Sequence, residues 1–594
     1  MTTKKVIQGG EFLIRETQAN EIFIPEEFNE EQRLIAATCK DFTDTQVLPN
    51  INQLDTHDRV LLKKLMKDAG ELGLLGISVP EEYMGFNQNF VTSMLAVEEM
   101  GKGYSFAVAY SGHTGIGTLP ILYFGNDEQK QEYLPKLATG EFIGAYCLTE
   151  PGAGSDANNG KTKAILSDDE TYYTMNGVKM WITNGGIADI LIVFAKIGDD
   201  KDLSAFIVDA HSEGVKIGVD EEKMGIKGSS TVQVFFEDTK VPAKNLLGKR
   251  MNGFKIALYI LNLGRIKLAG ATLGGSKATI TNAVNYANER KQFNTLISSF
   301  GAIQHKLAEM AIRTFVSESL TYRASQNIDD SIAELVNAGM DKGKAIVQGI
   351  RQFAIEASIA KVFGSEALDF VVDEGVQIYG GMGYSAETPV ERAYRDSRIN
   401  RIFEGTNEIN RMVTVGELLK RGMKGELDLM SPAKAVAAEL MGIPDFGSVS
   451  EDYFEEKHKI VINFKKSILM VAGAAIQKYA ASIQNQQELM MNVADMLMYT
   501  YAAESTLLRI EKMSTIYDEQ KMSLYKDLLN VFLYDTAHAI NKVGNDAVNS
   551  FAESDEQTAM LMGMKRFTKV KPVNTVKARR NIAAKIIADN QYKL

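Results

Sequence analysis

The sequence predicts a mainly α-helical protein with a β domain inserted between two helical regions. Two observations support this prediction. The 11 prolines leave the stretches 243–388 and 445–571 free of proline, and such stretches with helical periodicity are typical of helical bundles. Between residues 146 and 250, short runs of β-branched and aromatic residues alternate with turn residues, which indicates strands.

The first helical domain is expected over residues 1–145. Apolar residues recur at helical spacing in four segments, at 30–47, 60–74, 90–100 and 127–137. These segments predict four helices before the strands begin.

The middle β domain is expected over residues 146–250. Tyr172 to Thr183 contains the dipeptide Asn176-Gly177, which is typical of hairpin turns, so we expect a hairpin there. Further strands are expected at 190–195, 203–208 and 232–236.

Two more helical regions follow, a helical bundle over 251–421 and an additional helical domain over 422–594. The bundle is expected to contain helices at 262–290, 300–325, 335–360 and 365–377. The first of these is rich in glycine and alanine, which permits close approach of either another helix or a flat ligand. Residues 422–449 look irregular, and 453–589 helical.

Composition excludes several classes of function. A net charge of -11 argues against general nucleic-acid binding. Two cysteines cannot build a disulfide framework, and the six histidines lack metal-ligand spacing, so we expect no metal site. The start of the chain lacks the apolar region of a signal peptide, and we expect no apolar run long enough to span a membrane. We therefore expect a cytoplasmic protein, with peripheral membrane contact left open.

The stretch 401–411 holds a candidate general base. Glu404 follows the apolar pair Ile402-Phe403 and precedes Gly405. Apolar neighbours raise the pKa of a carboxylate by desolvation, and glycine lets a ligand approach the backbone closely. Alone, the pattern favours an exposed glutamate before a Gly-Thr turn over a catalytic base.

Common nucleotide and nucleophile motifs do not fit. No Gly-x-Gly-x-x-Gly stands at a strand-to-helix junction, and no serine lies in a nucleophile elbow. Gly160-Lys161-Thr162 resembles the end of a phosphate loop, but Ser155 occupies the upstream glycine position.

Two segments can bind a flat polar ring. Residues 146–156, with sequence YCLTEPGAGSD, offer hydroxyls and exposed amides where the first helical domain meets the β domain. Residues 179–186 include Trp181, the only tryptophan of the chain, which could equally be ordinary core.

These segments, in this order, resemble the acyl-CoA dehydrogenase family over about residues 30 to 421. The matching set also includes the segments Gly228-Ser229-Ser230, 289–293 (ERKQF), 377–384 (QIYGGMGY) and 403–407 (FEGTN). The helical extension makes the chain most similar to the very-long-chain branch and its bacterial relatives. The resemblance implies a β-barrel as the middle domain and a four-helix bundle after it.

The resemblance also implies FAD, held noncovalently between the β domain and the helical bundle. The residues that would contact FAD are Tyr146, Leu148, Thr149, Ser155, Trp181, Thr183, Arg290, Phe293, Gln304, Gln377, Gly380, Gly381, Thr406 and Glu408. In this family the group from Arg290 to Gly381 acts largely on the cofactor of the neighbouring subunit. A guanidinium suits a pyrophosphate, although Arg290 could also be a solvated helix end.

By the same resemblance, Glu404 matches the catalytic base that removes the α-proton of a fatty acyl-CoA. Some branches place the base on an earlier helix, where this chain has Gly264, so Glu404 has no rival. Substrate contacts are expected from Ser155, Asn262, Arg265, Glu404 and Gly405.

The expected activity is α,β-desaturation of fatty acyl-CoA in β-oxidation, with electrons passed to an electron-transfer flavoprotein. Small residues at Ala107, Ala109, Ser111 and Gly112 favour long chains. We expect a homodimer first and a tetramer second. The alternatives are an acyl-CoA oxidase and a non-enzymatic assembly scaffold. Residues 422–449 and the basic tail could bind anionic lipid, or the extension could simply cover a surface.

Overall fold

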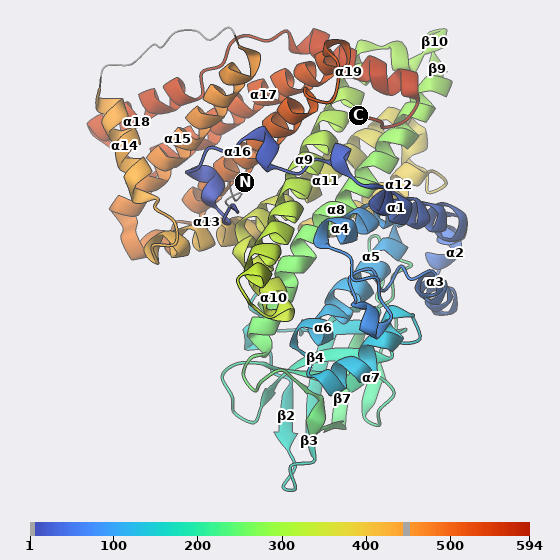
Figure 1. Ribbon diagram of the computed structural model, residues 1–594. Coiled ribbons are helices and arrows are strands. Elements are labelled where there is room, and N and C mark those ends of the chain that lie inside the picture. The colour runs from blue at the N-terminus through green and yellow to red at the C-terminus, as the bar shows by residue number, and fades with distance from the viewer. Residues whose placement is uncertain (1–5, 443–451) are drawn as a thin grey trace.

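The computed structural model describes residues 6–442 and 452–594, and these are mainly helical with one large sheet (Figure 1). The sheet lies at one end of the molecule, and the long helices α8, α9 and α11 run from it toward the C-terminal helices. The first residues of the chain, used above to exclude a signal peptide, and residues 443–451 of the irregular segment lie outside this description.

The first region is helical, as expected. Its helices are α1 (Glu30–Phe42), α2 (Ile51–Leu54), α3 (Arg59–Glu71), α4 (Phe90–Met100), α5 (Ser105–Ser111), α6 (Leu119–Phe124) and α7 (Asp127–Ala138). The chain continues from α5 into a π-helical turn over Gly112–Gly117, which borders the site described below.

The middle region is an eight-stranded sheet. Its strands are β1 (Gly144–Cys147), β2 (Lys163–Leu166), β3 (Tyr172–Thr183), β4 (Ile190–Ile197), β5 (Ser204–Asp209), β6 (Val215–Ile217), β7 (Thr231–Pro242) and β8 (Leu246–Leu247). They pair in the order β6-β7-β3-β2-β4-β5-β8, with β1 parallel to β4. Because no ladder joins β6 to β8 among the described strands, a closed barrel is not confirmed.

The hairpin predicted at Asn176-Gly177 is wrong. Strand β3 runs straight through this dipeptide and shifts its register against β7 there. The Asn176 side chain exchanges two hydrogen bonds with Asp238 of β7, both 2.9 Å long. A Cβ on Gly177 would lie 2.5 Å from the hydroxyl oxygen of Thr162, and Gly177 has φ +154°. The glycine therefore permits a bulge rather than a turn.

The second helical region surrounds a long central helix. It contains α8 (Gly253–Glu289), the short strands β9 (Lys291–Gln292) and β10 (Thr295–Leu296), α9 (Gly301–Asn337), α10 (Lys342–Gln352), α11 (Ala354–Tyr379), α12 (Pro389–Ser397) and α13 (Asn407–Met423). The helix expected over 335–360 is wrong. Gly339, at φ +90°, ends one helix, and the Asp341 side chain caps the next by accepting from the Lys344 amide.

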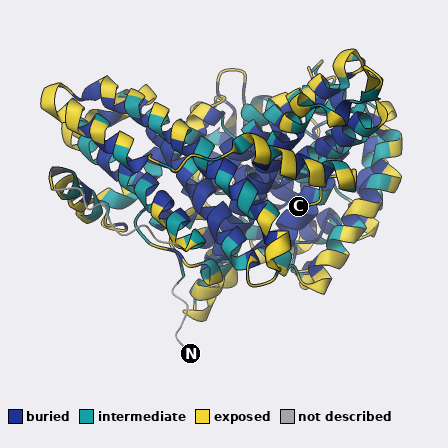
Figure 2. Cartoon of the chain, turned by 90° about the horizontal axis from the view of Figure 1, so that it is seen from above, coloured by how far each residue is buried: buried dark blue, intermediate teal, exposed yellow. Residues whose placement is uncertain are grey.

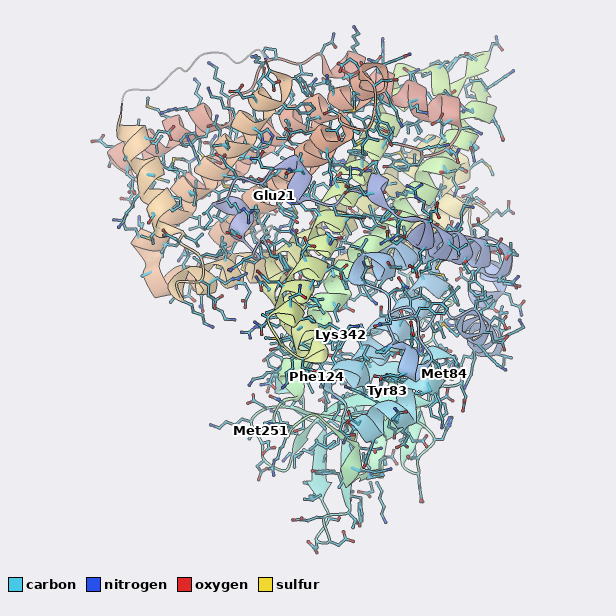
Figure 3. The ribbon with its side chains drawn as sticks, in the orientation of Figure 1. Glu21, Tyr83, Met84, Phe124, Met251 and Lys342 are labelled. Carbon is cyan, nitrogen blue, oxygen red and sulfur yellow. The ribbon has the colours of Figure 1, made fainter. Side chains whose placement is uncertain are left out.

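Side-chain contacts join the helices to the sheet. Phe124 at the end of α6 stacks on Tyr259 of α8, with ring centroids 5.9 Å apart. The amide of Met251 donates to the Ser204 hydroxyl of β5 over 2.9 Å. Phe124 and Met251 are both labelled in Figure 3, where the helical part meets the sheet.

The described residues of the C-terminal extension form six α-helices. They are α14 (Met430–Met441), α15 (Tyr453–Tyr479), α16 (Gln487–Met513), α17 (Glu519–Phe551), α18 (Ser554–Phe567) and α19 (Thr575–Asp589). Their buried faces share one hydrophobic core with α8, α9 and α11. Figure 2 shows the buried residues in the interior of the molecule and the exposed ones on its outer turns. The extension is therefore packed onto the helical bundle as part of one body.

A buried ion-pair network links the extension to the rest of the chain. Arg509 on α16 is 2% exposed and donates to Glu318 of α9 and to Glu26 of the N-terminal segment, each over 2.7 Å. Glu318 also pairs with Lys277 of α8. Arg323 of α9 pairs with Glu504 of α16 over 2.8 Å.

Within residues 6–442 and 452–594, two helices are long and apolar enough to cross a membrane, contrary to the expectation of none. They are α8 and α15, and 67% and 50% of their most apolar windows are buried inside the chain. In this structure both act as core helices.

Candidate active site

The loop around Glu404 is held by a small set of polar side chains. Thr406 caps α13 by accepting from the Ile409 amide over 3.2 Å. The Asn410 side chain donates to the carbonyls of residues 404, 405 and 406. Lys361 of α11 donates to the Gly405 carbonyl over 2.8 Å. Glu404 has φ +57°, which costs a residue with a side chain about 1 kcal/mol or more, so these bonds hold a strained conformation.

The Glu404 carboxyl group is suited to accept a proton. Its Oε2 atom is buried and has no hydrogen-bond partner among the described residues. Burial raises the pKa of Glu404 to about 7, although the nearby Arg265 and Lys361 cations lower it. The raised pKa predicted from the apolar neighbours is confirmed. A carboxyl group that titrates near neutral pH is efficient in general acid–base chemistry.

Gly264 of α8 lies directly against this carboxyl group. A Cβ at position 264 would be 2.5 Å from Oε2 and 2.9 Å from Oε1 of Glu404. Position 264, which carries the catalytic base in some branches of the family that the sequence resembles, therefore lies against the Glu404 carboxyl group. A side chain larger than hydrogen at this position would clash with that carboxyl group.

A cavity of about 150 Å³ opens beside Glu404. It runs along α8 from Gly264 to Thr279, which is 15 residues or about 22 Å of helix. Small residues line much of it, among them Ala107, Ser111, Gly112, Gly115, Ala271 and Gly275. Ala109, predicted to face the same space, is instead buried in the helical core.

The sheet forms another wall of the site. Thr183 at the end of β3 lines the cavity, and Trp181 beside it is 53% exposed with φ +61°. Trp181 is therefore not core. Tyr146 of β1 is buried with an unpartnered hydroxyl, and its pKa is raised by burial and, second, by the charge of Glu404.

The loop after β1 is fixed by a buried ion pair. Lys179, fully buried in β3, donates to the Leu148 carbonyl and to Glu150 over 3.1 and 2.6 Å. The Met180 amide donates to the Thr149 carbonyl over 2.9 Å. Ser155, further along this loop, is exposed.

The expected substrate contacts Asn262 and Arg265 lie near the base. The Arg265 guanidinium donates to the Asn262 side chain over 2.7 Å and to the Glu404 carbonyl over 3.4 Å. Gly405, the next residue, is half-buried with φ +82°, and its carbonyl accepts from Lys361 and Asn410.

A second group of expected residues lies far from Glu404. Arg290 follows the end of α8, 25 residues or about 37 Å of helix beyond Arg265. Phe293 is 91% exposed, and a Cβ on Gly380 or Gly381 would meet no atom within 4 Å. The stacked rings of Tyr286 and Tyr379, 4.1 Å apart, bring the ends of α8 and α11 together here.

The remaining expected residues divide between the two groups. Gln304, near Arg290, donates to the Ser298 carbonyl, and Gln377 is exposed at the end of α11. Thr406 and Glu408 lie beside the base, where Glu408 is exposed in the first turn of α13 and its pKa is lowered chiefly by a backbone hydrogen bond there. One chain therefore presents the expected cofactor residues as two separate surfaces.

Sequence reasoning missed three polar residues of the site. Lys361 and Asn410 position the Glu404 loop, and Lys267 of α8 lines the cavity. Lys361 and Lys267 each lie within a largely apolar helical segment, and a lysine in such a segment could have indicated a buried functional residue.

Family models match most of the chain. Residues 29–141, 145–239 and 251–419 match the N-terminal, middle and C-terminal domains of acyl-CoA dehydrogenase. A further model, also described as an acyl-CoA dehydrogenase C-terminal domain, matches residues 463–566.

Individual proteins agree with these matches. A probable acyl-CoA dehydrogenase of Bacillus subtilis is 43% identical over 587 residues, which cover 99% of this chain and 98% of the relative. The mitochondrial very long-chain specific acyl-CoA dehydrogenase of Bos taurus is 38% identical, covering 75% of this chain and 70% of the relative. The crystal structure of acyl-CoA dehydrogenase complexed with FAD from Bacillus anthracis has 44% identity and a TM-score of 0.96, covering 99% of this chain and all of that one.

Proposed function

The chain belongs to the acyl-CoA dehydrogenase family, and on that premise we propose that it desaturates long-chain fatty acyl-CoA thioesters between Cα and Cβ with FAD as its cofactor. The observation that supports this most is the Glu404 carboxyl group in the wall of an elongated cavity, whose buried Oε2 atom has no hydrogen-bond partner among the described residues. We take the four domains to be residues 1–145, 146–250, 251–421 and 422–594.

The residues present fit FAD. A flat ring would lie between Trp181 and Thr183 of β3 and the Glu404 loop, next to the unpartnered Tyr146 hydroxyl. Bound FAD would accept a hydride from the β-carbon of the substrate. Arg290 would pair with the pyrophosphate, and the open space at Gly380 and Gly381 admits close approach of a ligand to the backbone.

Residues of the chain itself would hold and deprotonate the substrate. Glu404 takes the α-proton on Oε2, which no described residue contacts by a hydrogen bond. The amide N–H of Glu404 makes no hydrogen bond to a described residue and can donate to the thioester oxygen, which stabilises the enolate-like charge. Asn262 and Arg265 would orient the thioester next to the base.

The activity should rise with pH through about 7. A base works only when ionised, and burial raises the pKa of Glu404 to about 7. Below that pH, kcat/KM should fall about tenfold per pH unit, and above pH 8 it should reach a plateau. Steady-state kinetics from about 1.5 pH units below this pKa to about 2 units above it measure the change. A flat profile across this range would contradict the prediction.

Gly264→Ala should slow flavin reduction by about 100-fold, because the new methyl group displaces the Glu404 carboxyl group from its position. The side chain of Glu404 can swing away, so the protein should stay folded. Gly416→Ala on α13 is the matched control, since a Cβ there meets no atom within 4 Å. Equal rates for the two variants would refute the close contact between Gly264 and the base.

A preference for long chains follows from the cavity. It extends about 22 Å along α8 from the base, and small side chains keep it open. Anaerobic titration with acyl-CoAs of several lengths, followed by bleaching of the flavin, tests both parts of the proposal. Palmitoyl-CoA should reduce the flavin faster than butyryl-CoA. Comparable rates with the two thioesters would contradict the proposed preference for long chains. If none of the acyl-CoAs bleached the flavin, the proposed activity itself would be refuted.

We propose a homodimer, with a tetramer as second choice. Arg290 lies about 37 Å along α8 from Arg265, which contacts the Glu404 loop, and this separation favours a single FAD held by two chains. A second copy would bring its Arg290 surface to the first copy's Glu404 site. Sedimentation of the holoprotein gives the subunit number directly.

Electron-transfer flavoprotein is the proposed acceptor. Trp181 is half exposed and only two residues from the cavity-lining Thr183, so a docked protein could come close to the flavin. Release of hydrogen peroxide in air without an acceptor protein would favour an oxidase instead. A colourless protein, or a flavin that no acyl-CoA bleaches, would favour a scaffold.

We propose a cytoplasmic location with peripheral membrane contact of the extension as an added role. Several basic residues of its end are already paired, since Arg579 contacts both Glu309 and Asp535, and Arg566 contacts Glu439. This favours packing as the main role of these side chains. Flotation with anionic vesicles tests the membrane contact, and no binding would remove it.

A further inference from the structure

The cavity beside Glu404 has a buried lysine in its wall that no other group neutralises. Lys267 on α8 is 5% exposed, and its amino group has no hydrogen bond or ion pair with a described residue. The other buried lysines among the described residues each donate to a carbonyl or carboxylate; these are Lys179, Lys361, Lys457 and Lys465. Burial alone lowers the pKa of Lys267 to about 8.

The lysine lies close to the reacting end of the cavity. It follows Gly264, the residue in contact with the base, by one turn of α8, or about 4.5 Å along the axis. Its stem passes Gly115 of the facing π-helical turn, where a Cβ would be 3.9 Å from Cδ of the lysine. It also borders a much smaller cavity of about 10 Å³ that includes Ser93 and Thr114.

The surroundings of Lys267 make an unpaired amino group costly. Apolar side chains such as Leu268, Leu368 and Val372 line much of the same cavity, and among the described residues no hydrogen bond joins the Lys267 amino group to the polar residues of the lining. An amino group without a partner in such a place costs free energy, whether it is charged or neutral. A saturated acyl chain in this cavity would leave that cost in place.

We propose that Lys267 donates a hydrogen bond to a hydroxyl or keto oxygen in the middle of the acyl chain, so that the site accepts oxygenated long-chain acyl-CoAs. This inference rests on the proposed function. Lys267 would be a specificity-determining residue, since a lysine offers only donors and an oxygen substituent supplies the acceptor. The reaction at Cα and Cβ is unchanged.

The position of Lys267 argues for a substituent within the chain rather than a carboxylate at its end. The cavity continues past Lys267 to Thr279, a further 12 residues or about 18 Å of α8. A short acyl group that ended at the lysine would leave that length empty. A long chain with an oxygen a few carbons beyond Cβ would fill the cavity and meet the amino group.

The test compares palmitoyl-CoA with a series of hydroxypalmitoyl-CoAs in which the hydroxyl moves along the chain one carbon at a time. For each, kcat/KM is divided by that of palmitoyl-CoA measured with the same holoenzyme. We expect one position to exceed its neighbours by about tenfold, as for a hydrogen bond to a buried polar group. Lys267→Met should remove this maximum, and Lys267→Gln, which keeps an N–H donor, should retain part of it.

Lys255→Met serves as the control, because this lysine is exposed on the first turn of the same helix, and it should leave the profile as in the wild type. A profile without a maximum, or a maximum that survives in Lys267→Met, would overturn the inference while leaving the proposed function intact. An equal loss of kcat/KM with every thioester in Lys267→Met would also overturn the inference, because it would show that Lys267 only contributes to packing. No flavin reduction by any of them would overturn both.

Discussion

Replacing Glu404 by glutamine should leave a yellow protein that binds acyl-CoA but reduces its flavin about 100- to 10,000-fold more slowly. Glutamine has nearly the same shape and fits the space beside Gly264, but it cannot accept the α-proton. The buried Oε2 atom, which no described residue contacts by a hydrogen bond, would be replaced by an amide group or its oxygen, neither of which is a useful base. Anaerobic stopped-flow mixing with palmitoyl-CoA measures the rate.

The control is Glu426→Gln, which changes an exposed carboxylate paired with Arg421 and should leave reduction unchanged. Retention of a near wild-type rate by Glu404→Gln would show that the base lies elsewhere. A loss of bound flavin would instead point to a structural role for the loop.

Replacing Arg509 by leucine should lower the free energy of unfolding by about 3 to 5 kcal/mol, the usual cost of removing one partner of a buried ion pair. The guanidinium pairs with Glu318 and Glu26 and lies 4.0 Å from the ring centre of Phe315. Without it, Glu26 loses its buried partner and Glu318 keeps only Lys277. Urea unfolding followed by circular dichroism measures the loss.

Arg250→Leu is the matched control, because Arg250 forms a bidentate but exposed pair with Asp200, which contributes about 1 kcal/mol or less. Burial opposes the ionised form of Glu318, but Lys277 and Arg509 outweigh it and lower the pKa of Glu318 to about 2. Its stabilisation is therefore present above pH 4.5 and is lost as the pH falls toward 2. In Arg509→Leu, the free energy of unfolding should depend less strongly on pH between about 4.5 and about 2 than in the wild type. Equal losses in the two leucine variants would contradict the network.

The sequence predicted a helix correctly where the apolar periodicity and the residues at the helix ends both indicated the same segment. The prediction failed where a local signal was compatible with two different structures. Helix α4 was expected over 90–100 and lies there. Asn176-Gly177 permits both a hairpin and a bulge, and the partner Asp238, 62 residues away, decides for the bulge. The break after Asn337 was readable from Gly339 and Asp341 but was missed because apolar residues continue on both sides.

The site shows the same division. The apolar residues next to Glu404 predicted its raised pKa, since desolvation is partly a local property. The contact with Gly264 joins residues 140 positions apart, and no period in the sequence encodes it. Lys361 and Lys267 look alike in sequence, each a lysine in an apolar run. Only the fold gives one of them a carbonyl partner and places the other against an open cavity.

The separation of the Arg290 surface from the Glu404 site has a thermodynamic consequence. A cofactor that bridges two copies would tighten their association, and by reciprocity association would raise the affinity for the cofactor by the same factor. Loading and assembly then become linked equilibria, so dilution alone would release flavin. The fraction of chains with bound flavin would then depend on protein concentration. On dilution, the dimer would dissociate, the flavin would be released and the activity would be lost in the same concentration range.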